Sequence, residues 1–268
     1  MKSVVLKWIV AFVVVLVIGA VVFLQKEGKI RDLNDITQEG RLVALIESGE
    51  YGFTRDSSKV RGFQYEIIRR YADYLGVELL LIHTDHFGNA YSDLNKGNFD
   101  VLVSLRPVST DSTGFVCSLI PILSTRLMLV QKRDSTGKLP VQYQYQLDNK
   151  TIHVQQTTPF IHRLKLLAGE MAADIDIIET DSESLDDLVS KVYQGDISFT
   201  ICPEYLAIKL SSKYPETDIS LPLSFKEDLS WMVHTESVDL KNSLNNFLAE
   251  FVGSPEYLNL YQQYFLVK

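Results

Sequence analysis

The stretch from residue 41 to residue 82 constrains the fold more than any other part of the chain. Residues 41–47, RLVALIE, form a short apolar run that ends at a Ser-Gly pair, which predicts a buried strand. Apolar side chains then recur at helical spacing from Phe63 to Leu75, and Gly76 stands where a helix cap is expected. Residues 77–82 form the next apolar run. Strand, helix and strand at this spacing predict a parallel sheet and an α/β fold.

A second pattern, in which a helix, a glycine and a strand follow one another, occurs twice. It surrounds Gly97, with a strand expected at residues 99–105, and it returns around Gly195, with a strand expected at residues 197–201. This recurrence fits two lobes of similar plan. Further runs predict strands at residues 128–132, 151–155 and 231–234 and helices at residues 160–172, 240–252 and 255–265.

The N-terminal segment predicts the compartment. Residues 8–24, WIVAFVVVLVIGAVVFL, contain no charge and approach the ~20 residues that a bilayer core requires. Lys2 and Lys7 precede them, as in an export signal. No clear cleavage site follows, so an uncleaved signal anchor is favoured over a cleaved signal peptide, although both stay open. Residues 1–30 are then a transmembrane helix with a tether, which the polar composition extends to about residue 40.

This interpretation places the chain in the inner (cytoplasmic) membrane as a single-pass protein, with its body in the periplasm or another extracytoplasmic space. Cys117 and Cys202 stand in apolar runs there, which favours free buried thiols and leaves a disulfide between them open. The 26 bases and 34 acids give a formal net charge of −8 without a basic block, which argues against nucleic acid as a partner. No phosphate loop, nucleophile elbow or CxxC motif is present. We therefore expect no metal, no cofactor and no catalytic residue.

Five segments together point to a known family: RLVALIESGEYGF, GFQYEIIRRYADYLGVELLLI, LNKGNFDVLVSL, TIHVQQTTPF and VYQGDISFTICPEYLA. Over residues 40–268 the chain resembles the family 3 extracellular solute-binding proteins. Within that family it is similar to the binding domain of membrane-bound lytic transglycosylase F. The resemblance implies a periplasmic-binding-protein-like fold of type II, with a ligand cleft between two α/β lobes. Lobe one would comprise residues 40–129 and 224–268, and lobe two residues 130–223.

The resemblance also implies that the ligand is held by loops after the strands, where open α/β sheets bind their ligands. In the first loop, Tyr51 and Phe53 are candidates for packing on the ligand, or for ordinary packing within the lobe. In the second loop, Ser104 and Arg106 are candidates. The arginine that grips an amino-acid carboxylate in this family is replaced, because its position falls on Asp111 or Ser112. Arg106 would supply that charge from a shifted position, unless it forms an ordinary salt bridge.

The third and fourth loops complete the expected site. Gln156, Thr157 and Thr158 precede a helix whose N-terminal N–H groups attract anions, with Thr158 as its N-cap and Pro159 as its first residue. In the fourth loop, Pro203 stands where amino-acid binders have an aspartate for the ligand's ammonium, and Glu204 would take over this role or cap the next helix. Two charges of the family's site are thus displaced. A peptide, a muropeptide fragment or another small polar solute is as good a candidate as a free amino acid.

The sequence therefore predicts a membrane-anchored binding protein that captures a small polar ligand by hinge closure of its two lobes. We expect a monomer that serves an ABC importer or a cell-wall enzyme. The alternative is a ligand-sensing or regulatory module that acts on a membrane or cell-wall partner without any role in transport. We expect no enzymatic activity, because lytic transglycosylases hold their catalytic glutamate in a separate domain that the resemblance does not cover. A hydrolase with an unrecognised site is the third reading.

Overall fold

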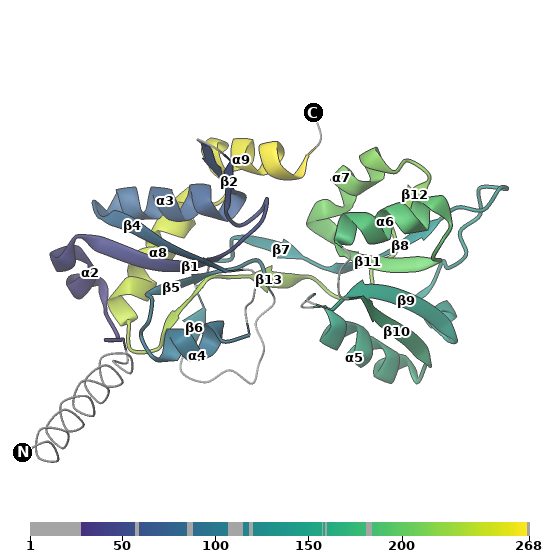
Figure 1. The fold of residues 1–268 in the computed structure, drawn as a ribbon, viewed down its shortest axis with the longest axis horizontal. Coiled ribbons are helices and arrows are strands. Elements are labelled where there is room, and N and C mark those ends of the chain that lie inside the picture. The colour runs from purple at the N-terminus through teal and green to yellow at the C-terminus, as the bar shows by residue number, and fades with distance from the viewer. Residues whose placement is uncertain are drawn as a thin grey trace, which may run out of the picture.

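Two five-stranded sheets, each flanked by helices, form two lobes that lie side by side along the long axis of the molecule (Figure 1). The computed structural model describes residues 28–56, 59–84, 88–106, 115–117, 120–156, 158, 160–180 and 184–266. Strands β7 (Leu123–Thr125) and β13 (Glu227–Leu229) pair antiparallel and carry the chain between the lobes. The α/β class and the two-lobe architecture expected from the sequence are confirmed.

Lobe one is built on a mixed sheet with the strand order β4-β1-β5-β14-β6. In that order the strands span Glu78–Thr84, Arg41–Glu47, Val101–Val103, Met232–His234 and Phe115–Cys117. β1 runs parallel to β4 and β5, whereas β14 runs antiparallel to β5 and β6. Its further elements are α2 (Leu33–Glu39), the hairpin of β2 (Thr54–Asp56) and β3 (Lys59–Arg61), α3 (Phe63–Leu75), α4 (Ala90–Asn95), α8 (Val238–Phe251) and α9 (Pro255–Phe265).

Lobe two repeats this plan with the strand order β10-β9-β11-β8-β12. In that order the strands span Ile175–Thr180, Lys150–Gln155, Phe199–Pro203, Leu127–Lys132 and Thr217–Asp218. β9 runs parallel to β10 and β11, and β8 runs antiparallel to β11 and β12. Its helices are the 3-10 turn η1 (Gln144–Leu147), α5 (Ile161–Met171), α6 (Leu185–Gln194) and α7 (Glu204–Lys213). The expected lobe boundary between residues 129 and 130 falls inside β8.

Amphipathic helices bury one face against each sheet. Helix α3 places Phe63, Ile67 and Tyr71 in the core with no exposed surface, as its apolar spacing predicts. Each such side chain contributes roughly 1.5–3 kcal/mol by leaving water. The same apolar cluster continues into lobe two through Leu206 and Leu210 of α7, so the lobes share buried surface. A second cluster fills the opposite face of the lobe-two sheet.

The expected tether is wrong over its described part, because residues 33–39 form helix α2. Asp32 begins the helix with a capping box that also involves Asp35, and Ile36 is fully buried. Arg31 just before it forms a buried ion pair with Asp100. Polar composition predicted a flexible segment, but one apolar side chain and one buried charge pair suffice to fix these residues on lobe one.

The predicted membrane span at residues 8–24 lies outside the described residues. Among the helices that the structure describes, none has the length and apolar content to cross a bilayer.

Candidate functional site

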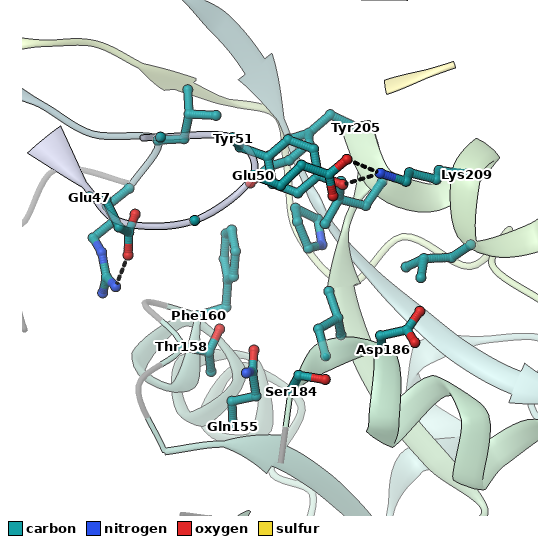
Figure 2. A pocket seen from close by; sticks show the side chains of 18 of the residues that line it. Glu47, Glu50, Tyr51, Gln155, Thr158, Phe160, Ser184, Asp186, Tyr205 and Lys209 are labelled. Carbon is teal, nitrogen blue, oxygen red and sulfur yellow. Dashed lines mark hydrogen bonds and ion pairs between the residues drawn. The ribbon is translucent and has the colours of Figure 1, made fainter. Parts of the chain in front are cut away.

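A cleft of about 740 Å³ lies where the two lobes face each other. Lobe one supplies residues 47–52, at and after the end of β1, and residues 105–106, which follow β5. Lobe two supplies Gln155, the last residue of β9, with Thr158 and Phe160 beyond it, together with side chains of α6 and α7. Figure 2 shows Gln155, Thr158 and Phe160 across the space from Glu50 and Tyr51. The wall is thus made by the carboxyl ends of parallel strands in both lobes.

The loop after β1 is held in place by a close approach of two backbone segments. A side chain at Gly62 would bring its first carbon within 1.9 Å of the Gly52 carbonyl oxygen, and Gly62 has a φ of +149°. Glycine is therefore required at this position. The Phe53 N–H donates to the Glu47 carbonyl at 2.9 Å, which turns the loop back on its strand. Glu50 and Tyr51 consequently stand at the tip that faces lobe two.

Three ion pairs line the part of the cleft that the structure describes. Arg106 pairs with Glu47 at 2.5 Å within lobe one, and both side chains are largely shielded from solvent. Lys213 pairs with Asp186 at 2.6 Å within lobe two. Lys209 on α7 crosses between the lobes and donates to Glu50 at 2.5 Å.

An aromatic contact joins the lobes next to the Lys209 pair. Lys209 also donates to the Tyr51 hydroxyl at 3.2 Å and stands 5.3 Å from its ring centre. The Tyr51 ring stacks on Phe265 of α9 at 5.2 Å and meets Tyr205 of α7 edge-on at 6.2 Å. Burial raises the pKa of Tyr51 and also that of Tyr205, so both hydroxyls stay neutral at physiological pH. These side chains connect the two walls of the cleft.

The structure brings three of the expected ligand residues to the cleft wall: Tyr51, Arg106 and Thr158. Gln156 is exposed outside the wall, and its neighbour Gln155 lines the cleft instead. Gln155 ends β9 and Gln156 follows it. Because successive side chains of an extended chain point to opposite sides, a prediction that is off by one position selects the wrong side chain. Thr157 lies outside the described residues.

Three other expected residues lie away from the cleft. Phe53 is buried on the far side of its loop, where it stacks on His83 at 5.2 Å. Ser104 is only 2% exposed and is packed next to β5. Glu204 begins α7 and pairs with Arg126 at 2.6 Å, and its second oxygen is 3.8 Å from Lys226. Both partners flank the crossing strands, so Glu204 stabilises the connection between the lobes.

The predicted capping of α5 is wrong. Phe160 is the N-cap residue and makes no side-chain capping bond, whereas the Thr158 N–H donates to the Gln155 carbonyl at 3.0 Å. The helix therefore begins only at Ile161. Phe160 itself thus offers no side-chain acceptor to the first turn of α5.

Several cleft residues were not anticipated from the sequence: Glu47, Glu50, Gln155, Asp186 and Lys209. A signal existed for Lys209, which follows Tyr205 by four positions and so shares its helix face. Glu47 ends the first strand, where ligand-facing residues gather. No local signal indicates that Lys209 reaches across to lobe one.

Two similar α/β lobes, two crossing strands and a cleft at the strand ends define a periplasmic-binding-protein-like fold. The profile of the bacterial extracellular solute-binding proteins, family 3, matches residues 42–267, and the chain belongs to this family. Among curated relatives, the membrane-bound lytic murein transglycosylase F of Desulfosudis oleivorans is 24% identical over 98% of this chain and 56% of its own length. The protein of the same name from Pseudomonas syringae pv. tomato is 24% identical over 90% of this chain and 47% of its own length. The chain thus spans about half the length of these relatives.

Solved structures share the fold at low sequence identity. A mutant of ArgBP from T. maritima aligns with a TM-score of 0.66 at 21% identity, covering 87% of this chain and 98% of that one. AbpA of Streptococcus pneumoniae, an amino acid ABC transporter substrate-binding protein bound to L-arginine, aligns with a TM-score of 0.67 at 18% identity, covering 87% and 97%.

Proposed function

We propose that this chain captures a small polar ligand in its cleft by closure of the two lobes and performs no catalysis itself. The observation that carries the proposal is the shared wall, in which loops of both lobes meet around one cavity next to two crossing strands. A ligand bound there touches both lobes at once only when they are closed. Its binding energy therefore shifts the population toward the closed state. The amino-acid-binding proteins whose solved structures share the fold support a small-molecule ligand.

The anchoring of the protein is a separate part of the proposal. The uncharged run at residues 8–24 supports a single-pass anchor in the inner membrane with the two lobes outside the cytoplasm. We expect the full chain to stay in the membrane pellet after alkaline carbonate washing, and added protease to digest the lobes in spheroplasts. Release into the wash, or protection of the lobes from protease, would contradict this topology.

The alternative function is a sensor or regulatory module whose closure changes its contact with a cell-wall enzyme or another membrane partner. Its support is the similarity to transglycosylases of about twice the length. If the protein acts in transport, we expect an ABC importer as its partner. We expect the chain to be a monomer. Ligand uptake by cells that carry the gene and by cells that lack it separates the two functions. Loss of uptake on deletion of the gene would favour transport over sensing.

The first experiment is thermal unfolding of the purified full chain with amino acids, short peptides and muropeptides. A ligand that binds only the folded protein raises the midpoint in proportion to its occupancy. Small-angle scattering with the same ligand should show a smaller radius of gyration. Absence of any midpoint shift across the set would contradict capture. Release of soluble fragments from peptidoglycan by the purified chain would contradict the absence of catalysis.

A further inference from the structure

We propose that the cleft selects an uncharged polar ligand and rejects free carboxylates and free amines. The inference rests on the proposed function and names the ligand class for the same cleft. Among the described residues that line the cleft, the basic side chains are Arg106, Lys209 and Lys213. Each of them already pairs with an acid of the wall, at 2.5, 2.5 and 2.6 Å respectively. The cleft therefore balances its own charges.

The neighbouring segments outside the described residues add no base. Residues 107–114, 157, 159 and 181–183 directly adjoin wall residues in the sequence, and they contain no lysine, arginine or histidine. They contain three acids, Asp111, Asp181 and Glu183. The segments that adjoin the wall in the sequence therefore supply no further base for a ligand carboxylate or phosphate.

The energetics of the Arg106–Glu47 pair decide against an exchange of partners. The Arg106 side chain is 19% exposed and that of Glu47 is 28% exposed. A ligand carboxylate that took Arg106 would leave the Glu47 carboxylate half-buried without its partner and facing a like charge. A ligand ammonium meets the mirror-image problem, because it must displace arginine or lysine from the acids of the wall.

The rest of the wall suits an uncharged ligand. The rings of Tyr51, Phe160 and Tyr205 stand beside aliphatic side chains such as Leu105 and Leu188. Such surfaces pack against the apolar faces of a ring or chain. Ser48, Gln155 and Thr158 supply hydroxyl and amide groups between them. Hydroxyl and amide oxygens on an apolar framework match this wall, and both neutral saccharides and capped peptides carry them.

Matched probes test the inference by thermal unfolding and titration calorimetry of the full chain. The probes are L-glutamine, its N-acetyl amide, the disaccharide of N-acetylglucosamine, and agmatine as an amine without a carboxylate. We expect the capped amide or the disaccharide to raise the midpoint by a few degrees, and L-glutamine and agmatine to leave it unchanged. The responding neutral probe identifies the peptide or saccharide source.

An equal or larger shift with L-glutamine or agmatine would overturn the inference while leaving ligand capture intact. Silence of these four probes, together with a shift by another charged ligand of the wider set, would overturn it as well. No shift with any ligand of either set would remove the proposed function and the inference with it.

A gain-of-function variant provides an independent measurement. Glu47→Gln keeps the shape of the side chain but releases Arg106 from its ion pair. We expect this variant to bind L-glutamine about tenfold or more tightly than the parent, because a guanidinium that no longer faces the Glu47 carboxylate can bind the ligand carboxylate. Glu170→Gln is the matched control, since it opens the Arg163–Glu170 pair on α5 and should change nothing. Unchanged or weaker L-glutamine binding in a folded Glu47→Gln variant would count against the inference.

Discussion

The two lobes share one sheet plan, but the charged side chain that follows the central strand of each sheet points in opposite directions. The central strand is β5 in lobe one and β11 in lobe two. In lobe one, Arg106 follows β5 and turns into the cleft, where it pairs with Glu47. In lobe two, Glu204 follows β11 and turns away from the cleft to Arg126 and Lys226. The position at a strand end sets the edge of the sheet where a side chain emerges. The nearest opposite charge then decides whether that side chain meets a ligand or braces the crossing strands.

Two ion pairs, one in each lobe, differ in how deeply they are buried. Lobe one encloses the pair of Arg31 and Asp100, whose side chains are 10% and 4% exposed. Lobe two has the Arg163–Glu170 pair, whose glutamate is 57% exposed. Asp100 also accepts the Val43 N–H at 2.7 Å. Lobe one therefore depends on its buried pair in a way that lobe two does not depend on its surface pair.

The largest expected effect comes from breaking that buried pair. Asp100→Ala removes the most buried acceptor of the Arg31 guanidinium, which keeps Glu39 as a more exposed partner. It also removes the carboxylate that accepts the Val43 N–H, and we expect a loss of about 3–5 kcal/mol in the free energy of unfolding. Glu170→Ala, the matched change in lobe two, should cost less than about 1 kcal/mol. Urea unfolding of both variants measures the difference. Similar losses in the two variants would remove the contrast between the lobes.

The next largest loss of stability is expected from a substitution at one of two compared glycines, one in each lobe. Gly62→Ala in lobe one must hold a φ of +149° and place a carbon 1.9 Å from the Gly52 oxygen, so we expect a loss of about 3 kcal/mol. Gly195→Ala in lobe two has a φ of +88° but nothing within 4 Å of the added carbon, and should lose only about 1 kcal/mol. The two midpoints of chemical unfolding test the order. A reversed order would mean that the loop after β1 moves aside freely.

Removal of a helix N-cap should lower the free energy of unfolding by the same amount in both lobes. Ser184 caps α6 of lobe two with a capping box, and Ser254 caps α9 of lobe one by accepting the Tyr257 N–H at 3.1 Å. We expect Ser184→Ala and Ser254→Ala each to lower the free energy of unfolding by about 1 kcal/mol. The same urea measurement applies. A much larger loss at one cap would show that its helix end has a tertiary role beyond capping.

The smallest effect is expected at the connection between the lobes. Glu204→Gln weakens partly exposed ion pairs with Arg126 and Lys226, so the free energy of unfolding should fall by less than about 1 kcal/mol. Because Glu204 lies outside the cleft wall, the ligand Kd should change by less than about twofold. Calorimetric titration with the ligand found for the parent checks this. A large loss of affinity would show that Glu204 takes part in ligand binding after all.

The sequence by itself determined the elements and the edges at which they end. Apolar spacing placed β1 at residues 41–47 and α9 at residues 255–265. Strand ends gather at one edge of a sheet, and the structure has Tyr51, Arg106 and Thr158 in the cleft wall there. Such patterns are local, and short-range backbone geometry and burial of one face are enough to decide them.

Only the tertiary structure decided which charges meet. Lys209 reaches Glu50 from 159 positions away, Glu204 turns to Arg126, and Arg31 enters the core to meet Asp100. A side chain of given type pairs with whichever opposite charge the packing brings within reach, and that neighbour leaves no periodic trace in the sequence. The strand ends of this protein were therefore predictable, whereas the charge balance of its cleft emerged only when the two lobes came together.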